Sequence, residues 1–309
     1  MTMTINPPPL LVIVGQTAVG KTELSLKLAE RFNGEIISAD SRLFYRGMNI
    51  GTAKPSSQEQ ARVPHHLIDV CAPNETLTLG DYQERANEII ADCHRRGTLP
   101  MLVGGTGQYV KAVVEGWGIP RVSPQLALRQ ELEKIGGPEL GRWLQTVDPV
   151  AAEKIDARNV RRVIRALEVT LVAGVPISQL QAKSPPNWSI MTIGLYRDRD
   201  ELYSRIDQRV DLMLEQGLLE EVRGLLAADY SWDLPAMSGL GYRQFQPYFE
   251  GESTLEEVAE RIKFETHRFS RQQNNWFRRN DESIDWFDAS APDLDAKVSR
   301  KVEEALNSL

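Results

Sequence analysis

The segment from Gly15 to Thr22 reads GQTAVGKT and fits the pattern G-x-x-x-x-G-K-T, which is typical of a loop that binds phosphate groups. An apolar run, LLVIV, precedes it, and a helical pattern follows it. In this setting, backbone N–H groups and the positive end of the helix surround an anion. Lys21 adds a positive charge, and the Thr22 hydroxyl is placed to bind Mg²⁺. The residues predicted to hold a di- or triphosphate are Gly15, Gln16, Thr17, Ala18, Val19, Gly20, Lys21 and Thr22.

Two further polar segments follow expected strands. ADSR, residues 39–42, contains Asp40, which can bind Mg²⁺ or accept a proton from a nucleophile, or can simply cap a turn. GGTG, residues 104–107, contains Thr106, which can contact a ligand beside flexible glycines or cap the following helix. The residues alone leave both interpretations open at each position.

Two other groups can bind anions. Arg205 and Arg209 are four residues apart and share a helix face, so they can clamp a diphosphate or form an exposed pair near Asp207. SGLGYRQ, residues 238–244, predicts a turn that presents polar side chains to bases or phosphates. Those side chains belong to Tyr242, Arg243 and Gln244.

Alternating strand and helix patterns must position these residues. Strands are expected at Leu10–Val14, Glu35–Ser38, His66–Val70 and Pro100–Val103, with a helix over Leu79–Arg96. This alternation predicts an α/β fold, a parallel sheet flanked by helices like that of P-loop NTPases. Ligands of such sheets bind at the carboxyl ends of the strands, where the phosphate loop, ADSR and GGTG all lie.

The remaining chain predicts two parts. Residues 119–189 carry short helical patterns and no convincing strand, which indicates a helical insertion domain in a core formed by residues 1–118 and 190–309. A strand returns at Ile190–Tyr196, and a long helix is expected over Thr254–Phe277. A last strand at Ile284–Phe287 and a helix at Leu294–Leu306 close the core.

Composition predicts a globular protein of the reduced cytoplasm. The chain has 309 residues, of which 41% are hydrophobic and 26% charged, and its net charge is −7. No apolar stretch approaches a membrane span, so no membrane partner is expected. Two distant cysteines and four histidines lack metal-ligand spacing, so the histidines are interpreted as structural.

Two local basic clusters contrast with the acidic total. Five basic residues lie between Lys154 and Arg165 against Asp156, and six lie between Arg261 and Arg279 against Glu265. Such clusters can serve a polyanion, but they can equally form solvated helix faces with pairing along the helix.

Several longer motifs carry a resemblance. They include GQTAVGKT, IISADSRLFYRGMNIGTAKP, PHHLIDV, LVGGTGQYVKAVVEG, IGLYRDRDELYSRIDQRV, GLGYRQF and RFSRQQNNWFRR. With these motifs the chain resembles bacterial tRNA dimethylallyltransferases (tRNA isopentenyltransferases) along nearly its whole length. The resemblance implies transfer of a dimethylallyl group from its diphosphate to N6 of the adenosine 3′ of the anticodon, in tRNAs that read codons beginning with U.

The resemblance also implies roles for individual residues. Asp40 would be the general base, Thr106 would orient the amine, and Arg209 would hold the diphosphate, with Mg²⁺ as cofactor on Thr22. The helical insertion would grip the anticodon stem-loop of a tRNA, and the enzyme would act as a monomer. The residues implied in tRNA binding are Ser41, Arg42, Leu43, Arg129, Arg161, Arg162, Arg165, Tyr242, Arg243, Gln244, Arg268, Arg271 and Gln272.

Leu43, Gln108 and Gln272 depart from the family pattern, and one rival function remains. Leu43 stands where a Gln is usual, so its hydrogen bonds to the adenosine are lost and Ser41 or Arg42 would carry more of the recognition. Gln272 stands where an Arg is common. The alternative function is that of a small-molecule kinase that uses ATP with the same loop and a helical lid.

Overall fold

The computed structural model describes residues 6–309, which divide into two compact units. The first unit holds the described residues up to Lys111 together with Asn187–Leu309, and the second is Ala112–Pro186. The insertion expected over residues 119–189 overlaps this second unit, which begins seven and ends three residues earlier.

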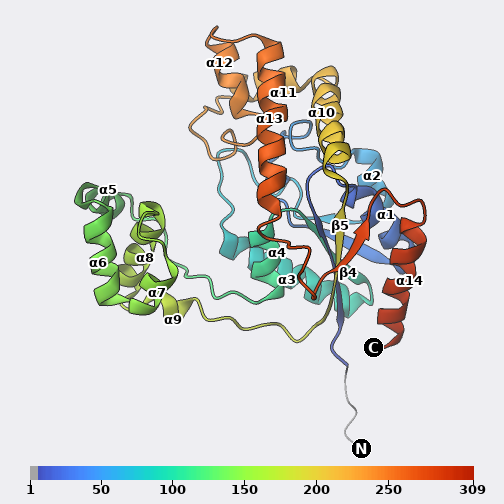
Figure 1. Ribbon diagram of the computed structural model, residues 1–309, viewed down its shortest axis with the longest axis horizontal. Coiled ribbons are helices and arrows are strands. Elements are labelled where there is room, and N and C mark those ends of the chain that lie inside the picture. Colours follow the sequence, from blue (N-terminus) through green and yellow to red (C-terminus); the bar gives the residue numbers. More distant parts are fainter. Residues whose placement is uncertain (1–5) are drawn as a thin grey trace, which may run out of the picture. The chain divides into compact units, whose positions relative to one another are not determined.

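The first unit is built on a parallel sheet of six strands, as expected (Figure 1). The strand order is β3-β2-β4-β1-β5-β6, and every neighbouring pair is parallel. The strands are β1 (Pro9–Gly15), β2 (Gly34–Ser38), β3 (His65–His66), β4 (Leu99–Gly104), β5 (Ser189–Tyr196) and β6 (Asp285–Asp288). The apolar run of β1 is buried on both faces, which places it inside the sheet.

Helices cover both faces of this sheet. On one face, α1 (Lys21–Phe32) and α14 (Leu294–Asn307) pack against the β1 side chains Leu11 and Ile13 (Figure 1). On the other face, α3 (Leu79–Arg96) buries a stripe of residues at helical spacing. Those residues are Tyr82, Ala86, Ile90 and Cys93.

Beyond the carboxyl ends of the strands, α10 (Arg199–Glu215) packs against α13 (Leu255–Gln273) (Figure 1). Thr254 caps α13, and Glu257 completes the capping box. The other helices of this unit are α2 (Ser57–Arg62), α11 (Leu218–Ala227) and α12 (Gln246–Phe249), while α4 (Gly107–Val114) begins in it.

Two elements are shorter than expected. The strand predicted over residues 66–70 stops at His66, because Leu67 and Asp69 have φ angles of 60° and 55° that an extended strand cannot contain. The long helix expected to reach Phe277 ends at Gln273, and turns carry the chain from there to residue 277.

The second unit is helical. It contains α5 (Leu126–Ile135), α6 (Gly137–Val147), α7 (Pro149–Lys154), α8 (Val160–Ala173) and α9 (Ile177–Leu180). Its core is separate from that of the sheet and includes Leu140, Leu144 and Leu167. A fully buried carboxylate, Glu168, accepts hydrogen bonds from the Gln125 backbone and from two arginine side chains described below.

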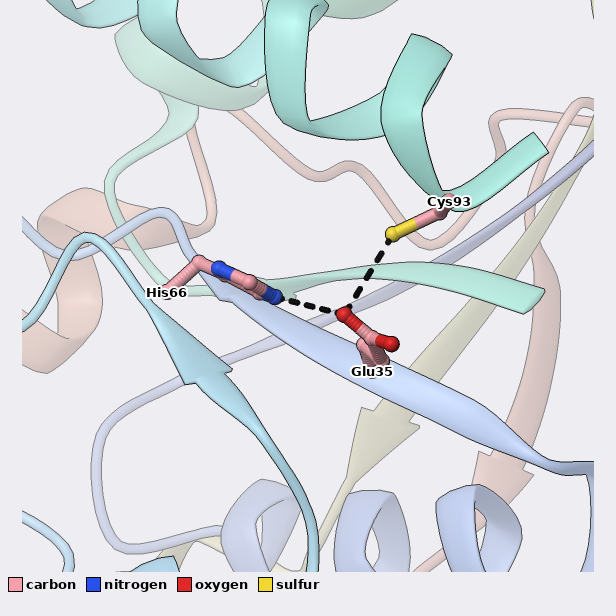
Figure 2. A group of neighbouring side chains, drawn as sticks. All are labelled: Glu35, His66 and Cys93. Carbon is pink, nitrogen blue, oxygen red and sulfur yellow. Dashed lines mark hydrogen bonds and ion pairs between the residues drawn. The ribbon is translucent and has the colours of Figure 1, made fainter. Parts of the chain in front are cut away.

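A buried polar cluster joins α3 to the edge of the sheet. His66 and Cys93 both point to one oxygen of Glu35, at 2.7 and 3.7 Å (Figure 2). These three side chains are of types that bind metals, but Arg96 pairs with both oxygens of the same carboxylate. The Arg96 guanidinium holds the pKa of Glu35 at about 2 despite burial, so the charge is already balanced. His66 is therefore a structural histidine, as the sequence predicts.

Candidate active site

The phosphate loop connects β1 to α1, and the side chain of Lys21 folds back onto the loop. Gly15 has a φ of 148°, and a Cβ there would lie 2.6 Å from the Leu195 carbonyl oxygen, so only glycine fits. Lys21 donates to the carbonyls of Gly15 and Gln16 at 2.9 and 2.8 Å. The first N–H groups of α1 have no acceptor within the helix, so they remain available to an anion.

A cavity of about 250 Å³, called the phosphate cavity below, lies over this loop. Its walls contain Lys21 and Thr22 together with Asp40, Arg205 and Arg209. Burial lowers the pKa of Lys21 to about 8, with Asp40 opposing this shift and Arg209 adding to it. Burial, and then the neighbouring Arg205, also lower the pKa of Arg209. Three cations (Lys21, Arg205 and Arg209) and three carboxylates (Glu23, Asp40 and Glu59) line this cavity, and the cations beside the loop can bind a diphosphate.

A second cavity of about 860 Å³, called the open cavity, adjoins the first. Thr17, Asp40 and Thr52 belong to the walls of both cavities. Thr106 lines the open cavity only. A carboxylate therefore stands between the phosphate cavity and a larger space, where it can act on a group that enters from the open side.

The sequence leaves open whether Asp40 and Thr106 contact a ligand or only cap a turn and a helix, and their hydrogen bonds distinguish these roles. Asp40 Oδ1 accepts the Arg42 backbone N–H at 2.9 Å, so it does cap a turn. No described residue donates a hydrogen bond to its second oxygen, which is left for a ligand. The Thr106 backbone N–H donates to Ala39 at 3.3 Å, and within residues 6–309 its hydroxyl has no hydrogen-bond partner. The Thr106 hydroxyl is therefore not used to cap the following helix.

Helix α13 completes the site through residues that the sequence did not indicate. Gln273 accepts the Thr17 N–H at 2.8 Å and donates to the Gly105 carbonyl at 3.0 Å. The aromatic side chains of Phe269 and Trp276 are 42% and 36% exposed and line the open cavity. In the sequence, the two aromatic residues are spaced by about two helical turns next to a basic helix face. This spacing was the one feature that could have indicated their place at the site.

Several residues implied in RNA binding gather around the open cavity. Ser41, Arg42, Arg243, Arg268 and Gln272 line it. The Arg42 guanidinium is held by the Pro235 carbonyl at 2.9 Å, and Arg243 pairs with Glu265. Leu43 instead lines the phosphate cavity, and Arg271 lines a third cavity.

Comparison with known proteins identifies the family of the chain. The IPP transferase profile matches residues 43–280. The chain belongs to the IPP transferase family. The tRNA dimethylallyltransferase of Roseiflexus castenholzii is 54% identical over 304 residues, covering 97% of this chain and 99% of that protein. The one from Chloroflexus aggregans is 57% identical over 274 residues, covering 87% and 93%.

Solved structures agree with this assignment. A tRNA isopentenylpyrophosphate transferase from Bacillus halodurans is similar with a TM-score of 0.73 and 39% identity, covering 97% of each chain. A eukaryotic dimethylallyltransferase acting on tRNA is similar with a TM-score of 0.85 and 27% identity, covering 97% of this chain and 80% of that one. Within residues 6–309, no helix is long and apolar enough to cross a membrane.

Two residues that the family resemblance placed on the RNA surface lie inside the protein. Tyr242 is fully buried, and its hydroxyl donates to Glu221 at 2.7 Å. Gln244 is also buried, accepts the Gly241 N–H at 2.9 Å and donates to Glu265 at 2.8 Å. This corrects the expectation of an exposed platform, of which only Arg243 is on the surface.

In the helical unit, the basic cluster divides into paired and unpaired residues. Arg129 donates to Glu168 at 2.8 Å through two nitrogens, and Arg165 donates to the same carboxylate at 2.6 Å. Burial raises the pKa of Glu168. The hydrogen bonds from Arg129, the Gln125 backbone and Arg165 outweigh this effect and hold the pKa at about 2. Arg129 and Arg165 thus have a structural partner in Glu168, and their expected contacts with tRNA stay a prediction. Arg161 and Arg162 are exposed, and neither guanidinium has a partner among the described residues.

Proposed function

We propose that the protein transfers a dimethylallyl group from dimethylallyl diphosphate to N6 of the adenosine 3′ of the anticodon, in tRNAs that read codons beginning with U. The observation that carries this proposal is the position of Asp40 in the wall shared by the phosphate cavity and the open cavity. One cavity suits a diphosphate, and the other has the size and polar lining to admit a nucleoside. The names of the similar proteins support the same reaction.

The reaction breaks the bond between the allylic carbon and the diphosphate oxygen and forms a bond from that carbon to N6. The N–H groups at the start of α1, together with Lys21, Arg205 and Arg209, stabilise the charge that grows on the diphosphate. The free oxygen of Asp40 accepts the proton that the amine loses. The unpartnered Thr106 hydroxyl orients the amine from the open side.

The described residues fit a magnesium ion beside the loop. Thr22 has a hydroxyl with no partner among the described residues, and it shares the phosphate cavity with Ser38 and Asp40. Hydroxyl and carboxylate oxygens, with the oxygens of a diphosphate, are the ligands that Mg²⁺ prefers. When bound, the ion would add positive charge on the leaving group.

The tRNA would contact residues of both units. Ser41, Arg42, Arg268 and Gln272 line the cavity, as does Arg243, while Arg161 and Arg162 offer unpaired charges in the second unit. Arg271, in the third cavity, belongs to the site argued in the next subsection. We expect a cytoplasmic enzyme that acts as a monomer, without a membrane partner.

A kinase is the weaker alternative. A kinase lid closes paired arginines on the γ-phosphate, and the cluster in the helical unit is the candidate for such a lid. Arg165 is instead bound to Glu168, and Arg158 is bound to Asp156. Arg161 and Arg162 remain unpaired among the described residues, so the names of the similar proteins, which describe transfer of a prenyl group, are what disfavours the kinase.

One assay separates the two functions. The protein is incubated with Mg²⁺, unmodified tRNA and either dimethylallyl diphosphate or ATP, and the digested RNA is analysed by mass spectrometry. We expect N6-dimethylallyl adenosine and free diphosphate with the first donor, and no ADP with the second. Formation of ADP without a prenylated nucleoside would refute the proposal.

A further inference from the structure

A third cavity, of about 360 Å³, lies beside the phosphate loop at the β5 and β6 side of the sheet. Its walls come from the end of β5, the first turns of α10, the last turn of α13 and Trp286 of β6. It touches the phosphate loop only at Gly15 and Gln16, and neither Lys21 nor Asp40 lines it. We call it the arginine cavity, and the proposed transfer reaction makes no use of it.

The charged side chains that line this cavity are all positive. Four arginines line it, Arg197, Arg199, Arg271 and Arg279, and no aspartate or glutamate does. Arg197 is fixed by the carbonyls of Val19 and Ala289 and by Glu201. The other three are exposed and pair with no carboxylate of the described chain. Asp288 interacts with Arg279 through their charges without forming an ion pair, and its Oδ1 accepts the Ser290 hydroxyl hydrogen.

Aromatic rings hold these guanidinium groups in place. The Arg279 guanidinium carbon lies 3.3 Å from the centre of the Tyr196 ring, and that of Arg199 lies 5.2 Å from the Tyr203 ring. Arg271 donates to the Tyr203 hydroxyl at 2.9 Å. Burial would raise the pKa of Tyr203, but the bonds from Arg271 and Arg199 lower it, which reflects the positive field here. A stacked guanidinium keeps N–H donors at its edge, the arrangement with which arginine binds phosphate.

We propose that the arginine cavity is a binding site for a phosphate group of a nucleotide. Arg199, Arg271 and Arg279 would bind the phosphate oxygens, while Leu202 and Phe277 offer an apolar wall to the sugar or base. The cavity has the volume of a small-ligand site. The nucleotide can belong to the bound tRNA or be free, because both sources carry the same group.

The last turn of α13 favours the tRNA. Arg268 and Gln272 of this helix line the open cavity, whereas Arg271 and Asn274 line the arginine cavity. An RNA strand that crosses the end of α13 would therefore reach both cavities. A backbone phosphate would enter the arginine cavity while a nucleoside occupies the open one.

The RNA source is tested with the double variant Arg199→Ala/Arg279→Ala and the matched control Arg300→Ala, an exposed arginine on α14. Binding of unmodified tRNA is measured over a range of salt concentrations. We expect the double variant to bind more weakly and to lose about one to two units of the salt slope, roughly one for each phosphate contact. The control should match the wild type, and equal thermal melting of all proteins shows that they fold.

Binding of a free nucleotide is tested in protein that carries Lys21→Ala, because this substitution weakens competing binding at the phosphate loop. Binding of AMP and of inorganic diphosphate is measured by calorimetry with and without the arginine substitutions. Loss of AMP or diphosphate binding in the double variant, with tRNA binding unchanged, assigns the site to a free nucleotide. The proposal is overturned if neither tRNA nor the small ligands bind the double variant differently from the control. Because these measurements need no prenyl donor, their failure is distinct from failure of the proposed transfer.

Discussion

Glu221 accepts the phenolic hydrogen of Tyr242 at 2.7 Å and also receives three consecutive backbone N–H groups, those of Asn49, Ile50 and Gly51, at 2.8, 2.8 and 3.1 Å. A Cβ at Gly51 would lie 2.6 Å from the Tyr242 ring, so only glycine fits at this position of the loop. The next residue, Thr52, lines both the phosphate cavity and the open cavity. Glu221 thus positions the segment NIGTAKP, whose function the sequence alone does not explain.

Glu221→Gln replaces one carboxylate oxygen by an amide NH2 group, which cannot accept the hydrogen bonds that this oxygen receives. We expect transfer at low donor concentration to fall by about ten- to a hundred-fold, since a displaced loop misplaces the donor. The loss should lie in KM for dimethylallyl diphosphate, with tRNA affinity nearly unchanged. The matched control is Glu220→Gln, on the exposed neighbour. Equal kinetics of the two variants would show that the loop holds its position without Glu221.

Asp40→Asn keeps the shape of the side chain and the bond to the Arg42 N–H, but it removes the base. We expect the chemical step to slow by about two to four orders of magnitude, as is typical when a general base is lost. Single-turnover transfer with both substrates saturating measures this step, and separate binding experiments serve as the control. A rate within a few-fold of the wild type would leave Asp40 only its role as a turn cap.

Binding of diphosphate should depend on the charge of Lys21. Its pKa in the ligand-free protein is lowered from 10.5 to about 8, so the ammonium loses its proton as the pH rises through about 8. We expect the affinity for inorganic diphosphate to fall by up to about tenfold per pH unit above that value. Folding disfavours this charge, so it costs stability below pH 8, and the cost disappears by pH 10.5. Calorimetry of wild type and Lys21→Arg, whose charge does not titrate, measures the difference.

Arg161→Ala/Arg162→Ala removes two unpaired charges from the helical unit. We expect weaker binding of all tRNAs alike and a salt slope smaller by up to about two units. Arg158→Ala is the control, since Arg158 is engaged with Asp156. A salt slope equal to that of the wild type would identify the pair as a solvated helix face.

The buried carboxylate of Glu35 should make stability depend on acid pH. Its folded pKa of about 2 lies below the usual 4.5, so its contribution is present above pH 4.5 and is lost as the pH falls toward 2. We expect wild type to exceed Glu35→Gln by about 3 kcal/mol near neutral pH, the free energy of such a shift, and the gap to shrink in acid. Denaturant unfolding from pH 3 to 7 measures it, with the exposed Glu303→Gln as control. A gap that does not change with pH would contradict the prediction.

Local patterns predicted the frame of the active site. The phosphate loop and five of the six strands follow from apolar runs and glycine spacing, and the position of Asp40 follows from the rule for strand ends. The rest depended on partners that are distant in the sequence or buried within helices. From its turn Tyr242 is expected to be exposed, but it is buried and bonded to Glu221, and the sequence gives no sign that Arg165 pairs with the buried Glu168. Periodicity cannot identify a buried acid that arginines neutralise.

Gln273 joins the Thr17 N–H at the end of β1 to the Gly105 carbonyl at the end of β4. β1 also needs β5 beside it, since Gly15 is in register with Leu195. During synthesis the phosphate loop therefore leaves the ribosome well before Leu195 and Gln273, the residues that support it. A nascent chain that ends before residue 273 carries the whole loop sequence without the side chain that ties it to β4. The complete support of the loop thus forms only after Gln273 has been made.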